Sequence, residues 1–375
     1  MGTYIVADWI MVDNFSASGV PELMFGRGVF ETLGQHTIGY GVRLLLVGDQ
    51  FLQHHPGLFK DVEDRLVQAG HVVQHVLAGE KQSDEAAAVI IERHNIENFD
   101  LVVSIGGGRA IDTGKIVAKK LPHIAVPTTA GTGAPMNGVI FGGQGAHEET
   151  QRRSLLPSLV VADPAFIDEM DRDDFAARAL GVLMLLIEAY VSPKASVLSD
   201  SLVWSGLEAF AKGFVSGVEG DNSGRDEVFF ASLMAGVGSG QAGFGLTHRM
   251  GVLVEQMSDL TYAQACSTLC AEICDFQIQL LSDRLPDSEA MDKYAMVGEL
   301  LASRPFEDRE EAYASLIGTL RRWVSRLEIA KIKIAKRDQN EIQKRIIADW
   351  DDVVLPVRLD GEDIHEILLR RSANT

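Results

Sequence analysis

Two turns rich in glycine and threonine, close together in the chain, constrain this sequence more than any other feature. They are SIGGGR at 104–109 and PTTAGTG at 127–133. Each follows a short apolar run, 101–103 and 124–126, typical of a strand buried on both faces of a parallel sheet. Because parallel strands end at the same edge of a sheet, we expect the two turns to meet there.

The residue types of these turns suit a nucleotide. A helical pattern follows Gly108, so the glycines lie where a strand passes into a helix N-terminus. Glycine lets the backbone approach a pyrophosphate, and the N–H groups and positive end of the helix favour that anion. A glycine turn alone also serves tight chain reversal, but the threonine hydroxyls of the second turn add donors. The predicted cofactor-binding residues here are Gly106, Gly107, Gly108, Arg109, Thr128, Thr129 and Thr132.

Asp49 follows another apolar run, 43–47. An acidic side chain at this point can accept hydrogen bonds from an adenosine ribose and repel a 2′-phosphate, which favours NAD over NADP. The same residue is also an ordinary helix N-cap. The sequence leaves both interpretations open.

Composition and charge narrow the class of protein. The chain has 375 residues, 46% apolar and 23% charged, as in ordinary globular proteins of two domains. A net charge of −19 argues against nucleic acid or an anionic membrane as partner. We find no signal peptide, and the longest apolar stretch, 179–187, is too short to span a bilayer. The prediction is a cytoplasmic enzyme acting on a small molecule.

Short strands alternate with helices up to about residue 165, and helical patterns follow. We therefore predict an α/β Rossmann-like domain with a parallel sheet over residues 1–163, and an all-α domain over residues 164–375. The active site is expected in the cleft between them. Three cysteines at intervals of four residues, Cys266, Cys270 and Cys274, fit either a metal site or a helix core, and their apolar neighbours favour the core.

In order along the chain, these motifs resemble the iron-containing (group III) alcohol dehydrogenase family, which includes the glycerol dehydrogenases and, more distantly, the dehydroquinate synthases. The segments that carry the resemblance include GGGRAIDTGK at 106–115, PTTAGTGAP at 127–135, LLPSLVVADP at 155–164, IEAYVS at 187–192 and GLTH at 245–248. The resemblance implies an NAD(P)-binding domain, a helical domain, a divalent metal in the cleft and a homo-oligomer such as a dimer.

The resemblance also implies metal ligands that this chain lacks. The family holds its metal with an Asp and a His on one helix and with two further His. The matching positions are Gly181, Leu185, His248 and Tyr262, of which only His248 is a usual ligand. Beyond residue 147 the only other histidine is His365. We therefore predict no catalytic metal.

Without a metal, hydride transfer requires another group to stabilise the developing alkoxide. His248 and Tyr262 are the predicted catalytic residues, although a lone histidine is also a common core residue. Gly181 and Leu185 would leave an apolar floor suited to a larger or less hydroxylated substrate than glycerol. We expect Arg152 or Arg153 to bind an anionic substrate group.

The first functional hypothesis is a metal-independent, NAD(H)-dependent oxidoreductase that interconverts a small alcohol and its aldehyde or ketone. A specialised biosynthetic pathway is one context in which such an enzyme would act. The second is a lyase or cyclase that uses the same cleft without net redox change. The third is a non-catalytic NAD-binding homologue.

Overall fold

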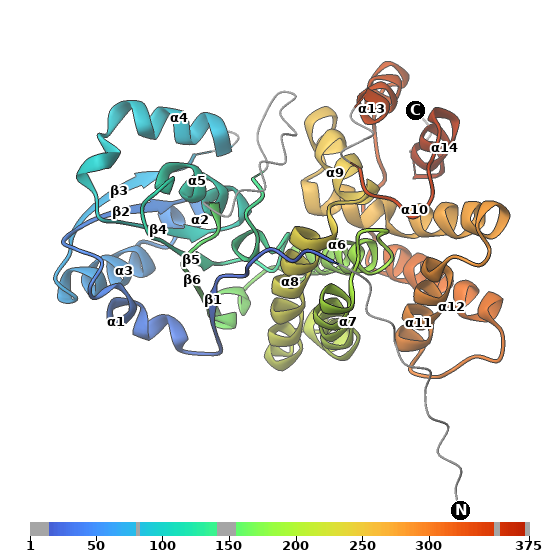
Figure 1. The fold of residues 1–375 in the computed structure, drawn as a ribbon, viewed down its shortest axis with the longest axis horizontal. Coiled ribbons are helices and arrows are strands. Elements are labelled where there is room, and N and C mark those ends of the chain that lie inside the picture. Colours follow the sequence, from blue (N-terminus) through green and yellow to red (C-terminus); the bar gives the residue numbers. More distant parts are fainter. Residues whose placement is uncertain (1–14, 80–82, 141–154, 349–352, 372–375) are drawn as a thin grey trace, which may run out of the picture.

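A computed structural model describes residues 15–79, 83–140, 155–348 and 353–371, and it divides into a sheet half and a helical half (Figure 1). The strands are β1 (Glu22–Phe25), β2 (Arg43–Gly48), β3 (Val72–Leu77), β4 (Leu101–Gly106), β5 (His123–Pro127) and β6 (Leu159–Ala162). The helices of this half are α1 (Leu33–Thr37), α2 (Gln50–His54), α3 (Pro56–Gln68), α4 (Ser83–Arg93) and α5 (Gly108–Ala118), with short 3-10 helices η1 (Val29–Thr32), η2 (Ile96–Asn98), η3 (Ala134–Met136) and η5 (Pro164–Ile167).

All the strand pairs are parallel, and the order across the sheet is β1-β6-β5-β4-β2-β3. The chain moves from β2 outward to β3 and then returns to the other side of β2 with β4. The order therefore reverses between β2 and β4, and ligands of open parallel sheets bind beyond the strand ends at such a point. The register aligns Gly48 with Ile105 and Gly106 with Pro127, so three strands end side by side.

Alternate residues of the central strands pack on opposite faces. Leu44 and Leu46 belong to the core beneath α1 and α3, whereas Leu45 and Val47 belong to the core beneath α4 and α5. Both sets are fully buried. Burial of both faces explains why these strands are continuous apolar runs in the sequence.

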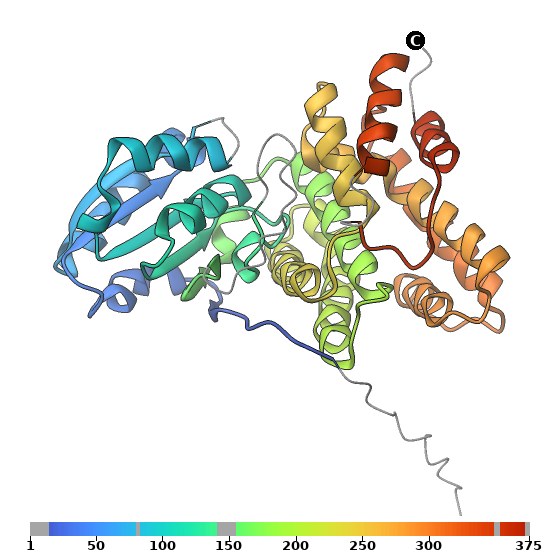
Figure 2. The same ribbon diagram turned by 45° about the horizontal axis from the view of Figure 1, so that its top comes forward.

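The helical half has its core around α6 (Arg172–Tyr190). This helix packs against α7 (Val197–Val218), α8 (Asn222–Ala242) and α10 (Tyr262–Arg284). In both views α6 and α8 lie between the sheet and the orange and red C-terminal helices (Figures 1 and 2). The other helices of this half are α9 (Leu246–Met257), α11 (Glu289–Ala302), α12 (Arg309–Arg326), α13 (Lys336–Ala348) and α14 (Gly361–Arg371).

A glycine contact joins the two halves. Gly133, at the end of the second predicted nucleotide turn, has a φ of 66°, in the left-handed region that favours glycine. A Cβ on Gly236 of α8 would collide with the Gly133 backbone. The glycine-rich end of α8 therefore lets the turn lie directly against the helix.

The predicted fold class, a parallel α/β half followed by helices, is confirmed. Strand β1 was not predicted, because it is a short edge strand whose residues are partly exposed. The domain boundary at residue 163 stays a prediction; β6 ends at Ala162 and α6 begins at Arg172. None of the described helices combines the length and apolarity needed to traverse a bilayer.

A buried histidine in β5 makes folding sensitive to acid. His123 is 3% exposed, and its Nε2 lies 2.7 Å from Ser104 Oγ. Burial, assisted by the charge of Lys115, lowers its pKa from 6.5 to about 3. Between these values the unfolded chain binds a proton that the folded chain does not, so stability is lost as the pH falls through this window.

We expect His123→Gln, which keeps a hydrogen-bonding group for Ser104, to weaken the pH dependence of unfolding between pH 6.5 and 3. The difference should approach roughly 5 kcal/mol at the acid end. Urea unfolding across this pH range measures it, with exposed His75→Gln on β3 as control. Parallel curves for wild type and His123→Gln would contradict the assignment.

Candidate active site

The site begins where β2 and β4 end. Asp49 is the N-cap of α2, and its Oδ1 accepts a hydrogen bond from Phe51 N at 3.0 Å. Its Oδ2 accepts from Gly107 N, the N-cap of α5, at 2.9 Å. A Cβ on Gly106 would collide with this carboxylate, and the φ of Gly106 is 148°. Asp49 therefore holds the first glycine turn in place, which the sequence interpretation as a ribose ligand did not foresee.

The threonines of the second turn face the glycines of the first. A Cβ on Gly107 would lie 3.5 Å from Thr129 Oγ1, and one on Gly108 would lie 3.3 Å from Thr132 Oγ1. The hydroxyl of Thr128 is buried and has no hydrogen-bond partner among the described residues. Free backbone donors at the start of α5 and an unsatisfied hydroxyl together fit an anionic ligand.

One cavity of about 1150 Å³ runs between the sheet half and the helical half. Every predicted cofactor-binding or catalytic residue except Gly106 lines it: Asp49, Gly107, Gly108, Arg109, Thr128, Thr129, Thr132, His248 and Tyr262. Single ligand pockets commonly measure roughly 300–1,000 Å³. The volume therefore leaves room for a dinucleotide and a small second molecule.

Arg109 spans the cavity. Its guanidinium forms an ion pair with Glu255 of α9 at 3.2 Å, and Glu255 Oε1 also accepts from Tyr262 N at 3.0 Å. The sequence predicts Arg109 as a cofactor-binding residue and does not identify its partner, Glu255. An ion pair between the two halves depends on how they pack together, so no local sequence pattern predicts it.

His248 and Tyr262 contribute a hydrogen-bonded pair to the helical wall of the cavity. The Nδ1 of His248, on α9, lies 2.7 Å from the hydroxyl of Tyr262, the first residue of α10. His248 is 5% exposed and packs on the ring of Phe244 at 4.7 Å between centroids. Burial, followed by the nearby Cys266, raises the pKa of Tyr262 well above 10. Tyr262 is therefore a neutral hydroxyl that can donate to a ligand oxygen.

Comparisons with known proteins agree with this geometry. Residues 21–164 match the family model described as iron-containing alcohol dehydrogenase, and residues 175–372 match the one for the C-terminal part of the Fe-containing alcohol dehydrogenase family. The chain belongs to the iron-containing alcohol dehydrogenase family.

Several curated members of the family are distant relatives. A probable alcohol dehydrogenase, EutG, of Salmonella typhimurium is 26% identical over 77% of this chain and 78% of its own length. An NAD-dependent methanol dehydrogenase of Bacillus methanolicus is 25% identical over 75% and 78%. Oxidoreduction between alcohols and aldehydes is the activity that these relatives support.

Solved structures share the fold. A 1,3-propanediol oxidoreductase superposes with a TM-score of 0.82 at 21% identity, covering 96% of this chain and all of the other. An iron-containing alcohol dehydrogenase of Thermococcus thioreducens gives 0.80 at 21% identity, covering 96% and 99%.

The four positions matched to the family's metal ligands do lie around one cavity, because Gly181, Leu185, His248 and Tyr262 all line it. Their donor set does not fit a metal of that family: two positions offer no donor atom, and the phenol of Tyr262 is held neutral. Among the described residues no cluster of three or more His, Cys, Asp or Glu could hold a metal ion.

Sequence reasoning gave no role to Glu188 of α6. Its Oε1 accepts from Thr247 N, in the first turn of α9, at 2.6 Å, so the carboxyl caps the helix that carries His248. Burial raises the pKa of Glu188 to about 7, against the opposing effect of the Thr247 hydrogen bond. The signal in the sequence was a single carboxyl within the apolar stretch 179–191.

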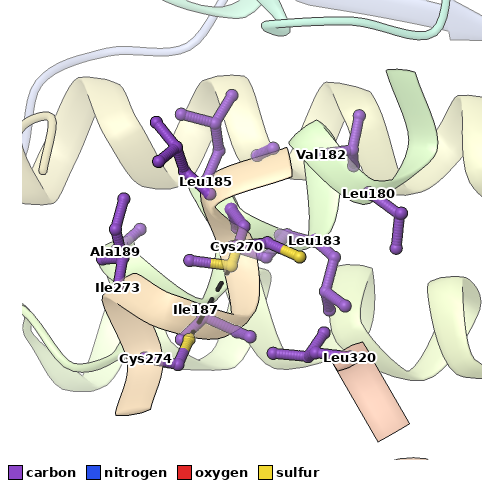
Figure 3. Close-up of a cluster of buried hydrophobic side chains, with 14 of the residues drawn as sticks. Leu180, Val182, Leu183, Leu185, Ile187, Ala189, Cys270, Ile273, Cys274 and Leu320 are labelled. Atoms are coloured by element: carbon purple, nitrogen blue, oxygen red, sulfur yellow. Dashed lines mark hydrogen bonds between the residues drawn. The ribbon is translucent and has the colours of Figure 1, made fainter. Parts of the chain in front are cut away.

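The three cysteines of α10 are buried and free of disulfides. Cys270 and Cys274 pack among α6 side chains such as Leu183 and Leu185 (Figure 3). The Cys274 thiol lies 3.7 Å from Met184 Sδ. Burial raises the pKa of Cys270 to about 12, which keeps its thiol protonated. Arg152 and Arg153, expected to bind an anionic group, lie outside the described residues.

We expect Asp49→Ala to weaken NADH binding by about 10-fold or more, because the glycine turn loses its anchor, and to lower stability by about 2 kcal/mol through two lost hydrogen bonds. NADH titration by fluorescence and urea unfolding measure these effects.

The matched control is Asp221→Ala, because Asp221 caps α8 through Ser223 N and Gly224 N. It should cost a similar stability and leave NADH affinity unchanged. Equal NADH affinity in wild type and Asp49→Ala would show that the anchor does not shape the cofactor site.

Proposed function

We propose that this member of the family is a metal-independent, NAD(H)-dependent oxidoreductase that interconverts a small alcohol and its aldehyde or ketone. The observation that carries the proposal is the 2.7 Å hydrogen bond between Tyr262 and His248 in the wall of the cavity that the two nucleotide turns also line. The family membership supports alcohol oxidoreduction as the reaction class.

The cofactor would be held at the start of α5 and along the second turn. The N–H groups after Gly107 and the hydroxyls of Thr128, Thr129 and Thr132 would bind its phosphates. The carboxylate of Asp49 lines the same cavity and would repel a 2′-phosphate, which favours NAD. The B. methanolicus relative is named as NAD-dependent, which supports the same choice. When bound, the nicotinamide supplies or accepts the hydride.

Tyr262 would be the proton donor in carbonyl reduction. If His248 Nδ1 carries a proton, it donates to the phenol oxygen, and the hydroxyl hydrogen of Tyr262 is then directed to a substrate oxygen. The raised pKa of Tyr262 keeps that hydrogen in place. In alcohol oxidation the same pair would take the proton back, as general acid–base catalysis requires.

Metal independence rests on the donor set. Gly181 and Leu185 replace two ligands of the family site, and the hydroxyl of Tyr262 is already hydrogen-bonded to His248. In this proposal the hydrogen-bond donors of the pair stabilise the developing alkoxide, the role that a Lewis acid otherwise fills. The homodimer and the cytoplasmic location stay predictions.

We expect Tyr262→Phe to lower kcat for carbonyl reduction by roughly 10²- to 10⁴-fold, the usual contribution of a positioned acid. NADH affinity should remain that of wild type. Tyr294→Phe is the matched control, because the Tyr294 hydroxyl is buried in the same helical half and bonds Gln277 Oε1 instead of His248. It should lose some stability and keep kcat.

NADH absorbance follows the reaction, with aliphatic and cyclic aldehydes and ketones as substrates. An unchanged kcat in Tyr262→Phe would contradict the role of Tyr262. Product formation without net change in NADH would favour the lyase or cyclase hypothesis, and NADH binding without turnover would favour a non-catalytic homologue.

A further inference from the structure

Helix α6 contains one glycine, Gly181, which lies within the apolar stretch 179–187. Glycine destabilises a helix interior relative to alanine, so its presence calls for a local reason. The two usual reasons are a left-handed backbone and a close approach by a neighbour.

Neither reason applies at this position. The φ of Gly181 is not in the left-handed region, and a Cβ built on it would meet only Cys266 Cβ, at an ordinary contact distance of 3.7 Å. The contrast is Gly206 of α7, where a Cβ would lie 2.7 Å from Met234 Cβ and 2.8 Å from Leu186. Helix packing therefore requires a glycine at position 206 of α7, whereas it leaves room for a Cβ atom at position 181 of α6.

The space next to Gly181 belongs to the cavity. Gly181 lines it together with four apolar residues of three helices: Val182 and Leu185 of α6, Val252 of α9 and Ala263 of α10. His248 and Tyr262 line the same cavity from α9 and α10. Asp174 and Arg178 of α6 also line the cavity, but they form an ion pair with each other. A ligand whose oxygen is bonded to Tyr262 has room to lay its carbon substituents against the apolar residues around Gly181, where a side chain is missing.

We propose that Gly181 determines substrate specificity, by leaving room for a branched or ring-shaped hydrocarbon group on the alcohol or carbonyl compound. This inference rests on the proposed function. An apolar wall gains from burying such a group, whereas a polyol would leave hydroxyls there without hydrogen-bond partners. The preferred substrates are cyclic or branched compounds, with small polyols disfavoured.

The test fills the space in two steps, with Gly181→Ala and Gly181→Val. We expect wild type to reduce cyclohexanone and benzaldehyde with a higher kcat/KM than propanal. Gly181→Val should lower kcat/KM for the ring compounds by about 10-fold or more and change propanal by less than about 3-fold, because a misplaced methylene commonly costs 10-fold or more. Gly181→Ala should lie between them.

Gly318→Ala on α12 is the control for helix propensity, because its new Cβ would meet only the flexible end of Arg322, at 3.3 Å. Gly318→Ala should keep the wild-type substrate preference. Equal losses for ring and linear substrates in Gly181→Val would overturn the inference.

Binding separates this inference from the proposed function. With NADH present, benzyl alcohol should raise the melting temperature of wild type and of Gly318→Ala more than that of Gly181→Val. If no carbonyl compound is turned over but this difference persists, the proposed reaction fails and the role of Gly181 stands. If benzyl alcohol stabilises wild type and Gly181→Val equally, or stabilises neither, the role of Gly181 is wrong.

Discussion

The carboxylate of Asp49 links the ends of β2 and β4, and the end of the cavity where we propose that NAD binds depends on it. Its two oxygens accept from Phe51 N and Gly107 N, so one side chain caps α2 and fixes the start of α5. The strand order reverses between the same two strands. Because the N-terminus of α5 is held at this reversal point, its N-cap Gly107 and its first residue Gly108 line the cavity.

The helical half supplies the other wall through α6, α9 and α10. The apolar packing of α6 fixes one side, and Glu188 ties the start of α9 to α6 through Thr247 N. This contact places His248 beside Tyr262, where burial raises the pKa of the Tyr262 hydroxyl. At the positions where the family has metal ligands, the chain has a glycine, a leucine and a hydrogen-bonded pair. In our proposal, hydrogen bonds from this pair polarise the carbonyl group of the substrate, a role that a Lewis acid otherwise fills.

Much of this arrangement could be predicted from the sequence, because it follows from local patterns. The central strands are apolar runs that end in glycine or threonine turns, and burial on both faces leaves little else that such runs can form. The placement of His248 and Tyr262 in one site came instead from the resemblance to the family, and the structure brings them into hydrogen-bonding distance.

The rest depends on tertiary contacts that a sequence does not reveal. The Arg109–Glu255 ion pair exists because the two halves approach each other, and the second hydrogen bond of Asp49 exists because β4 returns beside β2. Strand β1 is short and partly exposed, so it carries no clear periodicity. The empty space next to Gly181 likewise depends on how the neighbouring helices pack, and the glycine in the sequence does not reveal it.

The most direct measurement is the metal content of the protein purified without chelator, combined with NADH titration by fluorescence on the same sample. Our account predicts saturable NADH binding with far less than one equivalent of zinc, iron or other divalent metal per chain. A stoichiometric metal ion would contradict the account and return the chain to the metal-dependent chemistry of its family.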